Sequence, residues 1–143
     1  MSQTKLAFVA SQDETALQAK RELENKYPHV PENQADVVVV LGGDGKMLEA
    51  LRYYIDKPVK VFGMNKGTVG FLMNEFSSDN LIKRIEAATL VTLHPLRMHV
   101  ETSTGIVKEA LAFNEVSLLR ETSQTAKLRI TIDGTVRMEE LLC

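Results

Sequence analysis

Residues 36–45 read Asp36-Val37-Val38-Val39-Val40-Leu41-Gly42-Gly43-Asp44-Gly45, an apolar run that ends in a glycine-rich loop. A continuous β-branched run is typical of a parallel strand that helices cover on both faces, so we expect a strand over residues 36–41. Apolar residues then recur at helical spacing and predict a helix over residues 44–54. The glycine loop therefore lies at the carboxyl end of a strand and the amino end of a helix.

The alternation of strands and helices extends on both sides of this unit. We expect strands at Leu6–Ala10 and Val59–Phe62, helices at Asp13–Tyr27 and Leu81–Ala87, and a loop at Gly63–Gly70. Residues 77–80 offer several N-caps for the last helix. The fold class is therefore α/β, with residues 1–90 forming a parallel-sheet nucleotide-binding domain.

After about residue 89 the pattern changes to alternation with a period of two. It runs through residues 96–101, 106–118 and 127–142, and Asp133-Gly134 is expected to form a type I′ hairpin turn. We expect residues 91–143 to be the opening strands of a β-rich domain. The chain stops in mid-strand, so we expect this domain, and the chain, to be incomplete.

Composition excludes several classes of function. The 143 residues carry a formal net charge of −2, without the Lys/Arg excess that nucleic-acid binding requires. No apolar stretch approaches the roughly 20 residues that span a bilayer, which favours a cytoplasmic protein without a membrane partner. The single cysteine, Cys143, excludes an internal disulfide framework, and no Cys/His cluster indicates a structural metal. His94 and His99 have no carboxylate at a convincing spacing and are interpreted as packing or surface residues.

The glycine loop combines features of an anion site. The unpaired backbone N–H groups at the helix N-terminus and the helix dipole point toward the loop. Residues without a Cβ let phosphate oxygens approach the main chain. We therefore expect Gly42, Gly43 and Gly45 to cradle phosphate. The competing structural interpretation is a tight strand–helix connection in which Asp44 is only the N-cap.

Asp44 is the acid within this loop, and a phosphoryl-transfer enzyme needs an acceptor for a substrate hydroxyl beside its phosphate site. We expect Asp44 to be the catalytic residue, acting through alignment of that hydroxyl. Lys46 is a candidate phosphate contact, against the alternative of an exposed lysine without a partner.

Three motifs in this order resemble those of NAD kinases, above all the short bacterial enzymes: Leu41–Gly45, Gly63–Leu72 and Asn114–Leu118. Diacylglycerol and sphingosine kinases and phosphofructokinases have a loop similar to the first motif, whereas the second and third together are more specific. The resemblance covers nearly the whole chain.

The resemblance implies transfer of a phosphoryl group from ATP, or polyphosphate, to the 2′-hydroxyl of the adenosine ribose of NAD, with a divalent cation such as Mg²⁺. It implies that Asp44 accepts the proton, that Gly45 contacts NAD through its backbone, and that Asn114 and Glu115 grip the adenine and ribose. Phe71 would lie beside the adenine. It also implies a homodimer or homotetramer.

Structural alternatives remain open for these residues: a polar turn at Asn114-Glu115, a buried anchor at Phe71, and glycines with positive φ at Gly67 and Gly70. Two rival functions also remain, a lipid or sugar kinase and a non-catalytic nucleotide-binding module.

Beyond the region that this chain resembles, NAD kinases have an Asp-Gly pair and a segment rich in Gly, Ser, Thr and Ala. If 143 residues were the whole polypeptide, we would expect weak or no kinase activity.

Overall fold

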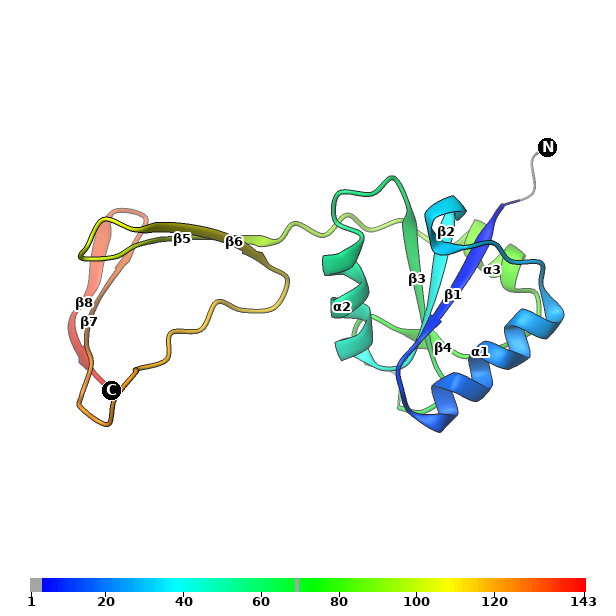
Figure 1. Cartoon of the computed structure of the whole chain (residues 1–143), viewed down its shortest axis with the longest axis horizontal. Coiled ribbons are helices and arrows are strands. Elements are labelled where there is room, and N and C mark those ends of the chain that lie inside the picture. The colour runs from blue at the N-terminus through cyan, green and yellow to red at the C-terminus, as the bar shows by residue number, and fades with distance from the viewer. Residues whose placement is uncertain (1–3, 69) are drawn as a thin grey trace.

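The computed structural model describes residues 4–68 and 70–143 and confirms the α/β class. Its first part is a parallel sheet in the order β1-β2-β3-β4 (Figure 1). The strands are β1 (Leu6–Ala10), β2 (Val37–Leu41), β3 (Lys60–Asn65) and the short β4 (Asn74–Glu75). Antiparallel hairpins follow this sheet.

Strand β2 is the centre of the core, as its continuous apolar run predicts. All five of its residues are buried, and it pairs in parallel with β1 and β3. Leu41 is in register with Ala10 on one side and Met64 on the other. The loops that follow β1, β2 and β3 therefore begin at the same edge of the sheet.

Helices cover both faces of this sheet (Figure 1). Helix α1 (Glu14–Lys26) and helix α3 (Leu81–Ala87) pack on one face through residues that include Leu23 and Leu81. Helix α2 (Asp44–Tyr53) packs on the other face through Met47 and Ala50. A short 3-10 helix, η1 (Glu32–Gln34), precedes β2. No helix in the described ranges is both long and apolar enough to span a bilayer.

The first helix begins at Glu14, one residue after the predicted start. Asp13 is the N-cap of α1 and its Oδ1 accepts a hydrogen bond of 2.9 Å from the Ala16 N–H. Hydrogen bonds from the Ser11 hydroxyl and the Ala16 N–H hold the pKa of the Asp13 carboxyl below its usual range. This cap closes the loop after β1, which runs beside the glycine loop. The N-cap position of α3 is Asn80, within the predicted set, but its side chain makes no capping hydrogen bond.

Strand β3 is longer than predicted, because the loop expected from Gly63 begins only after Asn65. Gly63 pairs with Val40 and is buried. A Cβ built on it would lie 2.6 Å from Met73 Sδ, so the glycine makes room for a packed methionine. Gly63 therefore belongs to the sheet core and not to the loop.

The second part of the described chain is two hairpins: β5 (Leu96–Glu101) with β6 (Val107–Ala112), and β7 (Lys127–Ile132) with β8 (Thr135–Leu142). Asp133 and Gly134 have φ of 49° and 76°, which confirms a turn with two left-handed residues.

Two expectations about this second part were wrong. The strand expected over residues 106–118 stops at Ala112, because Ala112 pairs with Leu96, the first residue of β5, and no partner strand extends further. Residues 113–126 are irregular. His99 does have a carboxylate partner, since its Nδ1 lies 3.1 Å from Oε1 of Glu109, the residue opposite it in the hairpin.

Candidate functional site

The glycine loop is tied to the strands around it at the carboxyl edge of the sheet. The Gly42 N–H donates to the Met64 carbonyl at 3.1 Å, and the Ser11 N–H donates to the Leu41 carbonyl at 2.9 Å. Gly42 has a φ of 145°, which side chains rarely adopt. The turn from β2 into α2 therefore requires a glycine at position 42.

Gly43 and Gly45 are different, because the protein itself does not require them to be glycines. A Cβ built on either meets nothing within 4 Å, and both residues are exposed. They lie at the first turn of α2, where backbone N–H groups have no intrahelical acceptor. The space and the donors there are open to a ligand, as an anion site requires.

Asp44 is not the N-cap of α2, so the competing structural interpretation of this residue is wrong. The N-cap is Gly43, and it makes no side-chain capping bond. The Asp44 carboxylate instead turns to the loop after β3, where Oδ2 accepts the Phe71 N–H at 2.9 Å and Oδ1 accepts the Leu72 N–H at 3.1 Å. We call this pair of hydrogen bonds the carboxylate clasp.

The clasp leaves Asp44 able to accept a further hydrogen bond. A carboxylate offers about four lone-pair sites, and the two loop amides use two of them. The residue is half-buried, so a ligand can reach it. The arrangement therefore orients the carboxylate while leaving it free to receive a hydroxyl proton.

Lys46 forms an ion pair with Glu49 and does not point into open space. Its Nζ lies 2.9 Å from Glu49 Oε1, one helical turn along α2, and its side chain is mostly covered. The i,i+3 spacing of the two charges was a signal in the sequence for this pair. A phosphate role for Lys46 requires that it leave Glu49 and stays a prediction.

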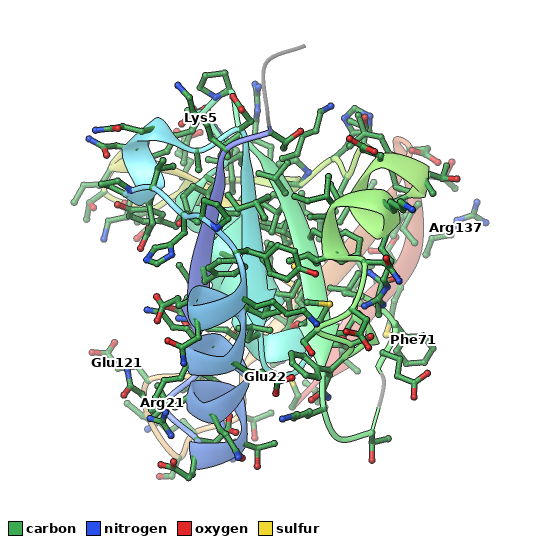
Figure 2. The ribbon with its side chains drawn as sticks, turned by 90° about the vertical axis from the view of Figure 1, so that its right-hand side faces the viewer. Lys5, Arg21, Glu22, Phe71, Glu121 and Arg137 are labelled. Carbon is green, nitrogen blue, oxygen red and sulfur yellow. The ribbon has the colours of Figure 1, made fainter. Side chains whose placement is uncertain are left out.

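Phe71 is the most exposed feature of the loop after β3. Its side chain is 101% exposed and projects away from the sheet, as Figure 2 shows, so a buried anchor is the wrong interpretation. Asn65 braces the start of the same loop, where its Nδ2 donates to the Thr68 carbonyl at 2.6 Å and its Oδ1 accepts the Gly67 N–H at 3.1 Å. Gly67 does not have the positive φ expected of it.

Asn114 and Glu115 lie outside the hairpins, in the irregular segment after β6, and both are exposed. Across residues 4–68 and 70–143, neither side chain forms a hydrogen bond with the glycine loop. The structure thus brings together Asp44 and the loop that carries Phe71, and it does not join the Asn-Glu pair to them.

The comparison with known proteins fits this arrangement of motifs. The profile of the ATP-NAD kinase N-terminal domain matches residues 1–93. The chain belongs to the NAD kinase family.

Relatives in the NAD kinase family match the chain over all or nearly all of its length. The NAD kinase of Hyphomonas neptunium is 52% identical over 143 residues, and that of Brucella suis is 50% identical over 145; each alignment covers 100% of this chain and 56% of the relative. The NAD kinase of Caulobacter vibrioides is 51% identical over 140 residues, covering 98% of this chain and 54% of the relative. The chain thus spans a little over half the length of these relatives.

The described part of this NAD kinase family member has several cavities that could take a ligand, and two of them bear on the site. A cavity of about 180 Å³ lies beside the glycine loop and is lined by residues that include Asp13, Gly42 and Lys66. A larger one, of about 690 Å³, lies beside β1 and the segments that enter β2 and β3, and includes Tyr53 and Lys57. Ligands of open α/β sheets bind at the carboxyl ends of strands, which makes the glycine loop the better candidate, although the cavity beside it is smaller and is not lined by Gly43, Asp44 or Gly45.

Alanine substitutions at two glycines of the loop are expected to change stability in opposite directions. Gly42→Ala places a methyl group 2.7 Å from Ser11 Oγ at a strained φ, and should lower the free energy of unfolding by about 1–3 kcal/mol. Gly45→Ala lies in α2 with open space around it and should raise that free energy by about 0.5–1 kcal/mol. Urea unfolding measures both, and a Gly42→Ala protein as stable as the wild type would contradict the loop geometry.

Proposed function

We propose that the protein is an NAD kinase, which transfers the γ-phosphoryl group of ATP, or a phosphoryl group of polyphosphate, to the 2′-hydroxyl of the adenosine ribose of NAD. The product is NADP. One observation supports this proposal above all: Asp44, at the mouth of the glycine loop, is oriented by two amides and keeps lone pairs free. Membership of the NAD kinase family makes NAD the expected substrate.

In the proposed reaction, Asp44 accepts the hydrogen bond of the 2′-hydroxyl and aligns its oxygen with the γ-phosphorus. The oxygen forms the new P–O bond, the bond to the leaving phosphate breaks, and the proton passes to Asp44. Because phosphoryl transfer proceeds through a loose transition state, alignment contributes more than early removal of the proton. Backbone N–H groups of Gly43 and Gly45 would stabilise the charge on the phosphates.

We propose that Mg²⁺ enters with the phosphoryl donor. Among the residues with described positions, no group of three or more His, Cys, Asp or Glu side chains could hold a metal ion. Mg²⁺ is commonly bound by substrate phosphates together with one or two carboxylates, so the proposal needs no such group. Asp44, within the glycine loop, is a candidate for one of these carboxylates.

The remaining parts of the proposal rest on resemblance to the family. Asn114 and Glu115 would grip the adenine and ribose of NAD, and Phe71 would cover the adenine. For Asn114 and Glu115 to bind NAD there, the segment after β6 must approach the glycine loop in the complex. We also propose a cytoplasmic homodimer or homotetramer, with residues 1–90 as the nucleotide-binding domain and residues 91–143 as part of a β-rich one.

Calorimetry with NAD, followed by an assay of NADP production, tests the function. For the whole protein we expect saturable binding of NAD and formation of NADP from NAD and ATP; residues 1–143 alone are expected to show weak or no turnover. Binding without turnover would favour a non-catalytic module. Absence of both, together with phosphorylation of a lipid or sugar hydroxyl, would overturn the proposal.

A further inference from the structure

Gly70 lies against the Asp44 carboxylate, 26 positions away in the sequence, and is exposed to solvent. A Cβ built on Gly70 would lie 2.5 Å from both Cγ and Oδ1 of Asp44. Real Cβ atoms essentially never come so close to another atom, so any side chain here would displace the carboxylate or the loop. The glycine is therefore required by a contact at the site, and not by packing in the core.

We infer that Gly70 is a positioning residue for Asp44: its missing side chain lets the loop after β3 close on the carboxylate and form the clasp. This inference rests on the proposed function, in which Asp44 receives the 2′-hydroxyl. Gly70 itself touches no reacting atom in this account. It acts through the orientation of Asp44.

The geometry of the clasp gives this role a physical basis. Each oxygen of Asp44 accepts one amide, at 2.9 Å from Phe71 and 3.1 Å from Leu72, so the two bonds together restrict rotation of the carboxylate group. Hydrogen bonds to a carboxylate are stronger than those between neutral groups. The same amides belong to Phe71 and its neighbour, so the clasp also holds the backbone from which the exposed ring projects.

Gly67 provides a matched comparison within the same loop. A Cβ built on Gly67 meets only Asn65 Oδ1, at 3.8 Å, which is an ordinary van der Waals contact. Gly70→Ala and Gly67→Ala therefore make the same chemical change three positions apart. Only the first should disturb Asp44.

Amide hydrogen exchange and urea unfolding of the ligand-free chain test the clasp. In Gly70→Ala, exchange of the Phe71 and Leu72 amides should accelerate about tenfold or more, and the urea midpoint should fall by about 0.5–1 M. Gly67→Ala should change neither. In an Asp44→Ala background the new methyl group meets no carboxylate, so Gly70→Ala should leave the midpoint unchanged.

Two results would overturn the inference: unchanged exchange of both amides in Gly70→Ala, or an equal fall in the urea midpoint with and without the Asp44 carboxylate. Calorimetry with NAD separates this inference from the proposed function. If the wild-type chain fails to bind NAD, the proposed function fails while the ligand-free measurements still decide the clasp. If it binds and turns over, kcat should fall about tenfold in Gly70→Ala while the KM for NAD changes only a few-fold, and an unchanged kcat would overturn the positioning role.

Discussion

Replacing Asp44 with asparagine is expected to reduce the rate of NADP formation on the order of 10²–10⁴-fold, the usual contribution of a positioned proton acceptor. Asparagine has nearly the same shape but only one oxygen, so it can accept one of the two amides of the clasp and cannot take up a hydroxyl proton. We expect kcat to fall and the KM for NAD to change only a few-fold. Steady-state kinetics with NAD and ATP measures both.

A matched control for this substitution is Asp56→Asn, which makes the same change at an exposed position just beyond α2. It should retain the kcat of the wild type within about twofold. If Asp44→Asn kept a kcat within tenfold of the wild type, Asp44 would not be the proton acceptor. If Asp56→Asn lost as much as Asp44→Asn, the loss would reflect charge or folding and not the site.

The largest effect on stability is expected from Leu23→Ala in helix α1. Leu23 is fully buried and belongs to the cluster that joins α1 and α3 to the sheet. Its truncation should lower the free energy of unfolding by about 2–5 kcal/mol, through lost burial and the cavity left behind. Thermal or urea unfolding, followed by circular dichroism, measures this.

Gln18→Ala is the control on the same helix. Gln18 is exposed, so its substitution should change the free energy of unfolding by less than about 0.5 kcal/mol. A Leu23→Ala protein within 1 kcal/mol of the wild type would mean that α1 does not pack on the sheet as described.

The fold around the glycine loop could be predicted from the sequence because its signals are local. The β-branched run of β2 and the apolar spacing of α2 need no knowledge of distant residues. The end of β6 could not be predicted in the same way. It is set by the length of β5, whose first residue pairs with Ala112, and the alternating pattern beyond Ala112 has no strand to pair with.

The candidate site was predictable in its residue types and not in its contacts. The glycines and Asp44 follow from the loop motif. The hydrogen bonds that the Phe71 and Leu72 amides donate to Asp44 could not be predicted, because they join residues 27 and 28 positions apart. For the same reason the sequence pointed to backbone freedom at Gly70, whereas the structure gives a steric requirement. Only the tertiary fold brings β3 and its loop beside α2.

A titration with NAD followed by ¹H–¹⁵N correlation spectra locates the ligand residue by residue and therefore shows whether NAD binds at the glycine loop. We expect saturable shifts of the amides of Gly43, Gly45 and Phe71, around the carboxylate clasp. Saturable shifts confined to Tyr53 and Lys57, beside the larger cavity, or no saturable shift at all, would contradict it.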